Sequence, residues 1–342
     1  MPADNEAQAG TTVRDGTISL SGRITSRVTV DLMEAYLGMD KTRREVTLDF
    51  SAADHLDISG INALVKLHLK AHSDGVRLRA SGLNPLMQEA FRAARIDGAV
   101  VPEPGPPGGE PPGLPEPRAW AEPVERLRVG EVPSGAVSLN VDGLRVSGVL
   151  QGFGRLWEKT YRMRLSGIGE GPREVIRTLK TRFPDFQPAY NRFYPLAGGI
   201  SPGSLVLINA GTPAGPIYTG VQVLYADEES FAFITPQGHP ESGWVSFSAH
   251  GAPGEVIVQV QGFARASDPL YELGFVLMGS RVQERIWRHL LVSLGRHYGK
   301  EPYVSVAKSC PGESLCWENA GNVRYNAQIR SLWHILMKLA GR

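Results

Sequence analysis

Ser59 carries a hydroxyl group at a predicted junction between a strand and a helix, where it could accept a phosphate or cap the helix. The segment DFSAADHLDISG, residues 49–60, ends a predicted strand and opens a predicted helix, with Ser59 at the junction. The free N–H groups and the positive dipole end of a helix starting around Ile61 could stabilise a phosphate on this hydroxyl. Alternatively, Ser59 or Asp57 caps the helix, which is the commoner role of such residues. Spacing alone favours the cap.

His239 and Glu241 are the ionisable residues of a tight G-H-P-E-x-G turn between two predicted strands. In a catalytic interpretation, His239 acts as a general base that Glu241 orients. In the other interpretation, the two side chains brace the hairpin. No nucleophile or second acid stands at a recognisable spacing, so the residues favour bracing.

Three other patterns give weaker chemical signals. His68 and His72 stand four residues apart on a predicted helix but lack a third ligand at a fixed offset, so we expect no metal. Cys310 and Cys316, in CPGESLC, do not have the spacing of zinc or thioredoxin-like sites. We expect two reduced thiols in a C-terminal loop, with a local redox pair as the alternative. The glycine-rich residues 167–171 lack a P-loop Lys, and we expect no cofactor.

Composition excludes several classes of protein. The chain has 342 residues, 36 Lys+Arg against 35 Asp+Glu, and a formal net charge of +1. This balance lacks the electrostatic footprint of a nucleic-acid binder, so we expect no direct nucleic-acid partner. We find neither a secretory signal nor a stretch of about 18 uninterrupted apolar residues. We therefore expect a cytoplasmic protein without a transmembrane segment.

A Pro- and Gly-rich segment divides the chain. Residues 101–118, VPEPGPPGGEPPGLPEPR, have almost nothing apolar to bury, and Pro lacks the N–H that helices and sheets require. The following residues are mixed in character and could pack on either neighbour, so we place the start of the second domain near Ala136. The expected parts are a first domain at 1–101, a linker at 102–135 and a second domain at 136–342.

The two domains have different patterns. The first alternates three short strands with three helices, which predicts an α/β domain with a small mixed sheet and packed helices. The second has five strand-like stretches between residues 204 and 263, followed by one long helix over residues 268–298. This predicts an α+β domain in which an antiparallel sheet wraps a long helix, an arrangement that often leaves a cavity. An amphipathic helix over residues 322–339 could cover this domain or meet a partner.

The first domain resembles the STAS domain of bacterial anti-sigma factor antagonists. The segments TISLSGRIT, VTLDFSAADHLDISGINALVKL and VRLRASGLNPLMQEAF carry the resemblance, which covers residues 13–98. It implies that Ser59 is the phosphoacceptor, that Asp57 and Gly60 support its turn, and that the partner is an anti-sigma factor with serine kinase activity. Adding a phosphate to a packed interface would end the complex. The sequence departs from the family at Ile58 and at residues 22–25, which favours the alternative of an interaction module that is never phosphorylated.

The second domain resembles the DUF1990 family over residues 161–299. The segments FITPQGHPESGWVSFSAH, IVQVQGFARASDPLYELG and SRVQERIWRHLLVSLGRHYG carry this resemblance. The family is similar to Bet v 1-like, START-related (SRPBCC) helix-grip proteins, which implies a cavity for a lipid or another hydrophobic small molecule. The implied cavity or turn residues are His239, Glu241, Phe231, Phe233, Trp244, Phe247 and Phe263.

Together these features predict a non-enzymatic bacterial regulator that switches partners at Ser59 and senses a hydrophobic ligand. The competing hypothesis is an enzyme that transforms its ligand with His239 or Glu241, with the first domain as a recruiting module.

Overall fold

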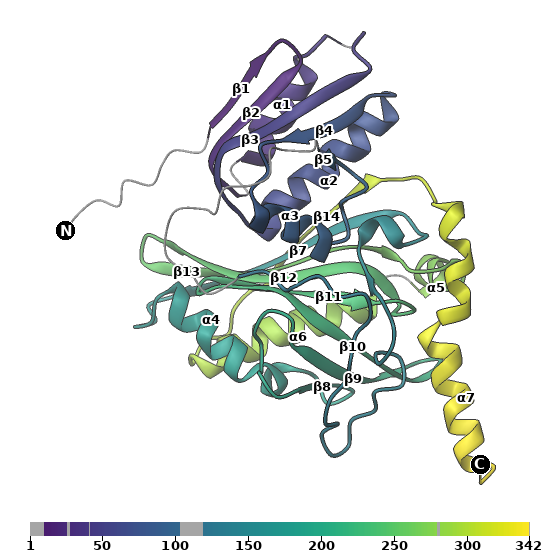
Figure 1. The fold of residues 1–342 in the computed structure, drawn as a ribbon. Helices are drawn as coiled ribbons and strands as arrows, with labels where there is room; N and C mark the ends of the chain where they lie inside the picture. The colour runs from purple at the N-terminus through teal and green to yellow at the C-terminus, as the bar shows by residue number, and fades with distance from the viewer. Residues whose placement is uncertain (1–9, 26–27, 41, 103–118, 279–280, 342) are drawn as a thin grey trace. The chain divides into compact units, whose positions relative to one another are not determined.

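The chain folds into two compact units, residues 1–118 and 119–342, which are described separately (Figure 1). Each unit is large enough to bury its own apolar core. The structure is a computed structural model that describes residues 10–25, 28–40, 42–102, 119–278 and 281–341.

The first unit is built on a five-stranded mixed sheet. Its strands are β1 (Gly10–Arg14), β2 (Thr17–Ile24), β3 (Glu45–Leu56), β4 (Arg77–Ser81) and β5 (Val101–Pro102). They lie in chain order across the sheet. The pair β1–β2 is antiparallel, whereas β2–β3, β3–β4 and β4–β5 are parallel.

Helices connect the parallel strands of this unit. They are α1 (Val28–Leu37), α2 (Ile58–Ser73) and α3 (Pro85–Ala93). Alternate residues of the strands are buried, such as Leu20, Leu48 and Phe50, as expected for a sheet with one covered face. Right-handed crossovers between neighbouring strands place their helices on the same face. The predicted α/β arrangement is confirmed.

The second unit is built on one large antiparallel sheet. Its strands run in the order β14, β7, β13, β12, β11, β10, β9 and β8, and β6 pairs with β11. The bounds are β6 (Val146–Ser147), β7 (Leu156–Ser166), β8 (Asn191–Pro195), β9 (Leu205–Thr212), β10 (Gly215–Ala226), β11 (Ser230–Pro236), β12 (Glu241–Ala252), β13 (Glu255–Ala266) and β14 (Ser305–Gly312).

Helices pack on this sheet and close its core. They are η1 (Val149–Gln151), α4 (Pro172–Thr181), η2 (Phe183–Phe186), α5 (Pro269–Met278), α6 (Arg281–His297), η3 (Trp317–Tyr325) and α7 (Ala327–Leu339). The apolar sides of α4 and α6 share one core with the sheet, including Leu179, Trp287 and Leu291. Figure 1 shows both helices on the same face of the sheet. The expected α+β helix-grip arrangement is confirmed.

The helices of the second unit differ from prediction at two places. The C-terminal helix α7 begins at Ala327 instead of at residue 322. We expected a single helix over residues 268–298, and the structure has α5 and α6 instead. Residues 279 and 280 lie outside the described residues. None of the helices in the described ranges is long and apolar enough to cross a membrane.

The second unit also begins earlier than the expected boundary near Ala136. The Ala121 N–H donates to the Leu224 carbonyl at 2.8 Å, and the Trp120 ring packs on Tyr225 with centroids 4.9 Å apart. The Leu127 N–H donates to the Leu144 carbonyl at 2.8 Å. Since these bonds tie residues 119–135 to the second unit, only residues 103–118 of the expected linker remain, and they lie outside the described residues.

Candidate functional site

The turn at Ser59 lies where β3 meets α2. Asp57 is extended, and its carboxylate accepts the Gly60 N–H at 2.8 Å, which makes Asp57 the N-cap of a helix that begins at Ile58. Ser59 is therefore in the first turn of α2, where it is half-buried. This helix begins three residues before the expected Ile61. Ser59 has the dipole environment expected of it, whereas the cap itself is Asp57.

Gly60 holds this turn against the end of β2. A Cβ at position 60 would lie 2.5 Å from the Ile24 carbonyl oxygen and 2.7 Å from Leu56 Cδ1. The same carbonyl accepts the Asp57 N–H at 3.3 Å. The carboxyl ends of parallel β2 and β3 meet at one edge of the sheet, which brings residues 22–25 beside the Ser59 turn.

The second unit contains a cavity of about 410 Å³. Strands β7 to β13 line it together with α5, α6 and the start of α7. A volume of this size fits a small molecule, and mostly apolar walls favour a hydrophobic one. Apolar lining residues include Phe193, Ile208, Ile217, Val221, Phe233 and Ile286.

Of the aromatic residues implied for the cavity, some line it and others are buried elsewhere in the unit. Phe233 and Trp244 line it, whereas Phe231, Phe247 and Phe263 are buried outside the lining. Phe247 stacks on Phe231 with ring centroids 4.6 Å apart, inside the core shared with α6. Phe263 packs on Trp244 across the neighbouring strand at 5.7 Å. Sequence alternation could not tell core from cavity, since both lie inside the unit.

His239 and Glu241 both line the cavity, but they do not form a dyad. His239 Nδ1 lies 3.0 Å from the carbonyl oxygen of Glu241 and 3.1 Å from its amide nitrogen. The ring therefore binds the backbone of the turn instead of the carboxylate. Burial lowers the pKa of His239 from 6.5 to about 4, so the ring is neutral at pH 7. This contact of the ring with the turn backbone is the one expected if His239 braces the hairpin.

The Glu241 carboxylate instead belongs to a polar chain across the cavity wall. Gln283 Nε2, from α6, donates to Glu241 Oε2 at 2.6 Å, and Lys159 Nζ, from β7, donates to Gln283 Oε1 at 2.7 Å. Burial raises the pKa of Glu241, and the Lys159 charge opposes that rise. Burial likewise lowers the pKa of Lys159 against the pull of Glu241.

Sequence reasoning missed Lys159 and Gln283, although each leaves a signal in the pattern. Lys159 has the same alternation phase as the buried Tyr161 and Met163 of β7, so its side chain points inward. Gln283 precedes Trp287 by one helical turn on the apolar stripe of α6. Both are polar residues at positions where the periodicity of the strand or helix predicts a buried apolar side chain, and this mismatch is the signal that could have identified them.

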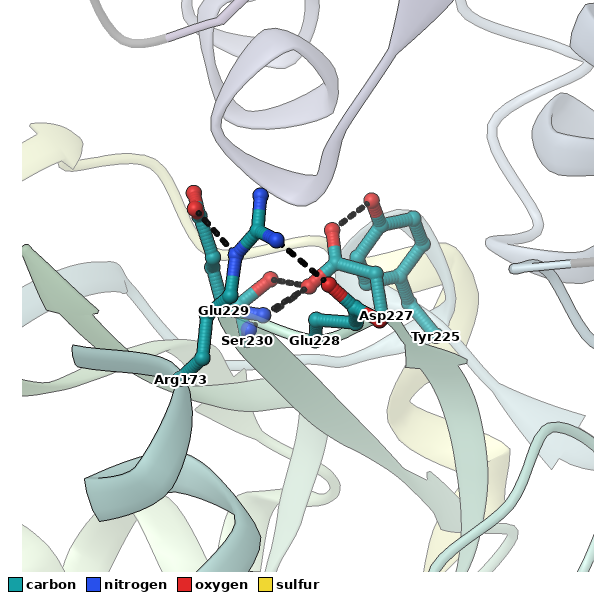
Figure 2. Close-up of polar contacts among 6 residues, drawn as sticks. All are labelled: Arg173, Tyr225, Asp227, Glu228, Glu229 and Ser230. Carbon is teal, nitrogen blue, oxygen red and sulfur yellow. Dashed lines mark hydrogen bonds and ion pairs between the residues drawn. The ribbon is translucent and has the colours of Figure 1, made fainter. Parts of the chain in front are cut away.

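A second polar cluster lies at the turn between β10 and β11 (Figure 2). The Asp227 carboxylate accepts the Glu229 N–H at 2.8 Å, the Ser230 N–H at 2.6 Å and the Tyr225 hydroxyl at 2.5 Å. Arg173 of α4 pairs with Glu228 at 3.0 Å and with Glu229 at 3.3 Å. These contacts fix the turn and fasten α4 to it, which is a structural role.

The remaining chemical candidates do not gather into a site. Cys310 lies on β14, not in the expected loop, and both it and Cys316 are free thiols whose pKa burial raises. The rings of His68 and His72 stack at 6.0 Å. Among the described residues, no group of three or more His, Cys, Asp or Glu side chains could hold a metal ion.

Two solved structures are similar to part of this chain. The di-domain ARO/CYC protein StfQ of the steffimycin biosynthetic pathway is 10% identical, with a TM-score of 0.34, over 42% of this chain and 51% of that one. This chain thus spans about half the length of that protein. A START superfamily protein from Mycobacterium smegmatis is 16% identical, with a TM-score of 0.33, over 43% of this chain and 98% of that one. Neither likeness bears on what this chain binds.

Family models assign the two units. No curated protein matches this sequence. Residues 7–102 match the family model described as "Mlab, STAS domain", and residues 159–293 match the model described as "Domain of unknown function (DUF1990)". Both matches agree with the folds of the units that contain them. The chain therefore carries a STAS domain in its first unit and a DUF1990 domain in its second.

Proposed function

We propose that the chain is a cytoplasmic, non-enzymatic regulator that binds a hydrophobic small molecule in its second unit and a protein partner through its first. The cavity of about 410 Å³ carries this proposal, because its walls are mainly apolar. The partner proposed for the STAS domain is an anti-sigma factor with serine kinase activity.

Binding in the cavity can be tested with N-phenyl-1-naphthylamine, a neutral apolar dye that fluoresces out of water. We expect the wild type to bind the dye and an Ala210→Phe variant, whose new ring fills the cavity, to bind it at least tenfold more weakly. Ala340→Phe is the control, because Ala340 is exposed beyond α7. Circular dichroism checks that both variants fold. Equal binding by the wild type and Ala210→Phe would contradict a ligand site in this cavity.

The proposed switch in the first unit is phosphorylation of Ser59. Its hydroxyl lies in the first turn of α2, where the helix dipole favours the added charge of about −1.5 to −2. The same charge would repel the nearby Asp57 carboxylate and any acidic group of a docked partner, so we propose that modification releases the partner.

Mass spectrometry of protein purified from its own host tests this switch. We expect a phosphate-sized mass on the wild type that is lost in Ser59→Ala and retained in Ser73→Ala. Ser73 is a suitable control because it is exposed at the other end of α2. If a partner co-purifies equally with Ser59→Ala and Ser59→Asp, the first unit is an interaction module without a switch.

A second candidate function is catalysis on the cavity ligand. The observation that favours it is the meeting of His239, Glu241 and Lys159, three ionisable groups with shifted pKa values, in one cavity wall. Incubating an organic extract of the host with the wild type and with Glu241→Gln tests it. A product formed only by the wild type would favour the enzyme, and identical extracts would favour the regulator.

A further inference from the structure

We infer that the cavity selects a hydrophobic molecule that ends in a hydroxyl group, and that Lys159 and Glu241 hold this hydroxyl. The inference rests on the proposed ligand binding and specifies its chemistry. Lys159, Glu241 and Gln283 all line the cavity, and they come from β7, β12 and α6. The three side chains thus form one connected polar site in a mainly apolar wall.

The Gln283 amide sets the spacing of the site. Its oxygen accepts from Lys159 and its nitrogen donates to Glu241, so one amide group separates the two charges. An ammonium has three donors and a carboxylate has about four acceptor positions. Of the bonds that the described residues make, Gln283 uses one donor of Lys159 and one oxygen of Glu241. Each charged group therefore keeps hydrogen-bonding capacity for a ligand.

Burial makes that remaining capacity energetically important. Lys159 is 9% exposed, and a buried donor without a partner costs free energy. Burial lowers the pKa of Lys159 and raises that of Glu241, while each charge opposes the shift of the other. A ligand hydroxyl beside the Gln283 amide would accept from Lys159 and donate to Glu241 without adding a third charge.

The lining contains two more polar atoms that await a partner. Thr219 Oγ1 and Trp287 Nε1 are buried and have no hydrogen-bond partner among the described residues. Their residues are 2% and 7% exposed, and both line the cavity. Each atom can donate a hydrogen bond to a further oxygen of the ligand. A mainly apolar molecule with a few polar groups would therefore fit the lining.

Hydroxyl, ether and carboxylate ends differ at this site. A hydroxyl accepts from Lys159 and donates to Glu241, whereas an ether accepts but cannot donate. A carboxylate would bind Lys159 but would place a second negative charge beside Glu241. The geometry therefore favours an alcohol over both alternatives.

Displacement of N-phenyl-1-naphthylamine by matched probes tests this selection. Decan-1-ol and 1-methoxynonane have the same atoms and nearly the same length, and decanoate supplies the anion. For the wild type we expect decan-1-ol to displace the dye at a concentration at least tenfold lower than either other probe. In the double variant Lys159→Met, Glu241→Leu we expect the concentrations at which the alcohol and the ether displace the dye to differ by less than twofold. Lys308→Met is the control, because Lys308 lies outside the lining and pairs with Glu284.

The outcomes separate this inference from the function beneath it. If the wild type binds the dye but alcohol and ether displace it equally, or decanoate displaces it best, the selection for a hydroxyl is wrong while the cavity still binds ligands. If neither the dye nor decan-1-ol binds the wild type, the ligand-binding function itself fails, and the inference fails with it. The wild-type comparison gives this answer even if the double variant does not fold.

Discussion

Single residues in this chain acquire their roles from what lies opposite them in space. His239 and Glu241 are separated by one Pro, yet the His239 ring binds the turn backbone and the Glu241 carboxylate reaches Gln283 on α6. The two side chains have different partners because His239 lies in the turn, whereas Glu241 is the first residue of β12 and its side chain reaches α6. The two residues therefore contact different elements and do not form the pair of the catalytic interpretation.

Titration of His239 provides a prediction at this scale. Its pKa is lowered from 6.5 to about 4, so the neutral ring stabilises the folded state at pH values above 6.5. This stability is lost as the pH falls from 6.5 toward 4, since the unfolded chain binds the proton first. We expect the wild type to lose up to about 2 kcal/mol more than His239→Asn between pH 7.5 and 5, measured by urea unfolding. Parallel losses in both proteins would show that the ring is not held neutral.

Gly60 provides a second prediction. In Gly60→Ala, the new Cβ would press on the backbone oxygen of Ile24, which cannot rotate away, so the turn carrying Ser59 must shift. We expect a loss of about 1–3 kcal/mol in the free energy of unfolding. Gly98→Ala should change it by no more than about 0.5 kcal/mol, because nothing lies within 4 Å of a Cβ at that position. Denaturant titration compares the two variants, and equal effects would contradict the close packing.

At the scale of elements, α7 turns its amphipathic pattern away from the sheet. Its apolar side, including Trp333 at 65% and Leu336 at 59% exposure, faces outward. Its buried side has small or polar residues, Ala327 and Ser331. Ser331 Oγ accepts the Tyr218 N–H of β10 at 2.9 Å and the Asn140 side-chain amide at 3.2 Å. Hydrogen bonds and close approach thus dock this helix, and Trp333 and Leu336 on its apolar side stay exposed.

In most amphipathic helices, substitutions on the apolar side destabilise the fold more than substitutions on the polar side. For α7 we expect the opposite. Ser331→Val leaves the Tyr218 N–H and the buried Asn140 side-chain amide without this acceptor, so we expect a loss of about 1–3 kcal/mol in the free energy of unfolding. Leu336→Gln, on the exposed apolar side, should cost no more than about 0.5 kcal/mol. Urea unfolding of both variants provides the measurement. A larger effect at Leu336 would mean that α7 packs through its apolar side in solution.

At the scale of the whole molecule, two units with separate cores should unfold separately. We expect calorimetry of the full chain to show two transitions. N-phenyl-1-naphthylamine at about 100 times its dissociation constant should stabilise only the unit with the cavity, by about 2.7 kcal/mol, which corresponds to roughly 5–10 °C. Ser59→Asp should leave that transition in place. A single transition that moves as one with the dye would show that the units are energetically coupled.

The sequence by itself determined the fold of each unit. Strand alternation at Leu20 and Leu48, the helical stripe through Trp287 and Leu291, and the cap and Pro at residues 84 and 85 all read directly from local periodicity. These features are local because a strand or helix repeats within a few residues. The residue motifs likewise located the Ser59 turn and the His239 turn on the correct elements.

Only the tertiary structure decided which side chains share the cavity. Lys159, Glu241 and Gln283 are distant in the chain, and their meeting depends on the register of β7, β13 and β12 and on how α6 crosses them. The same holds for residues 119–135, whose backbone bonds to the second unit follow from the position of β10, and for the outward side of α7. Local periodicity states that a residue points inward, but long-range pairing determines what it meets there.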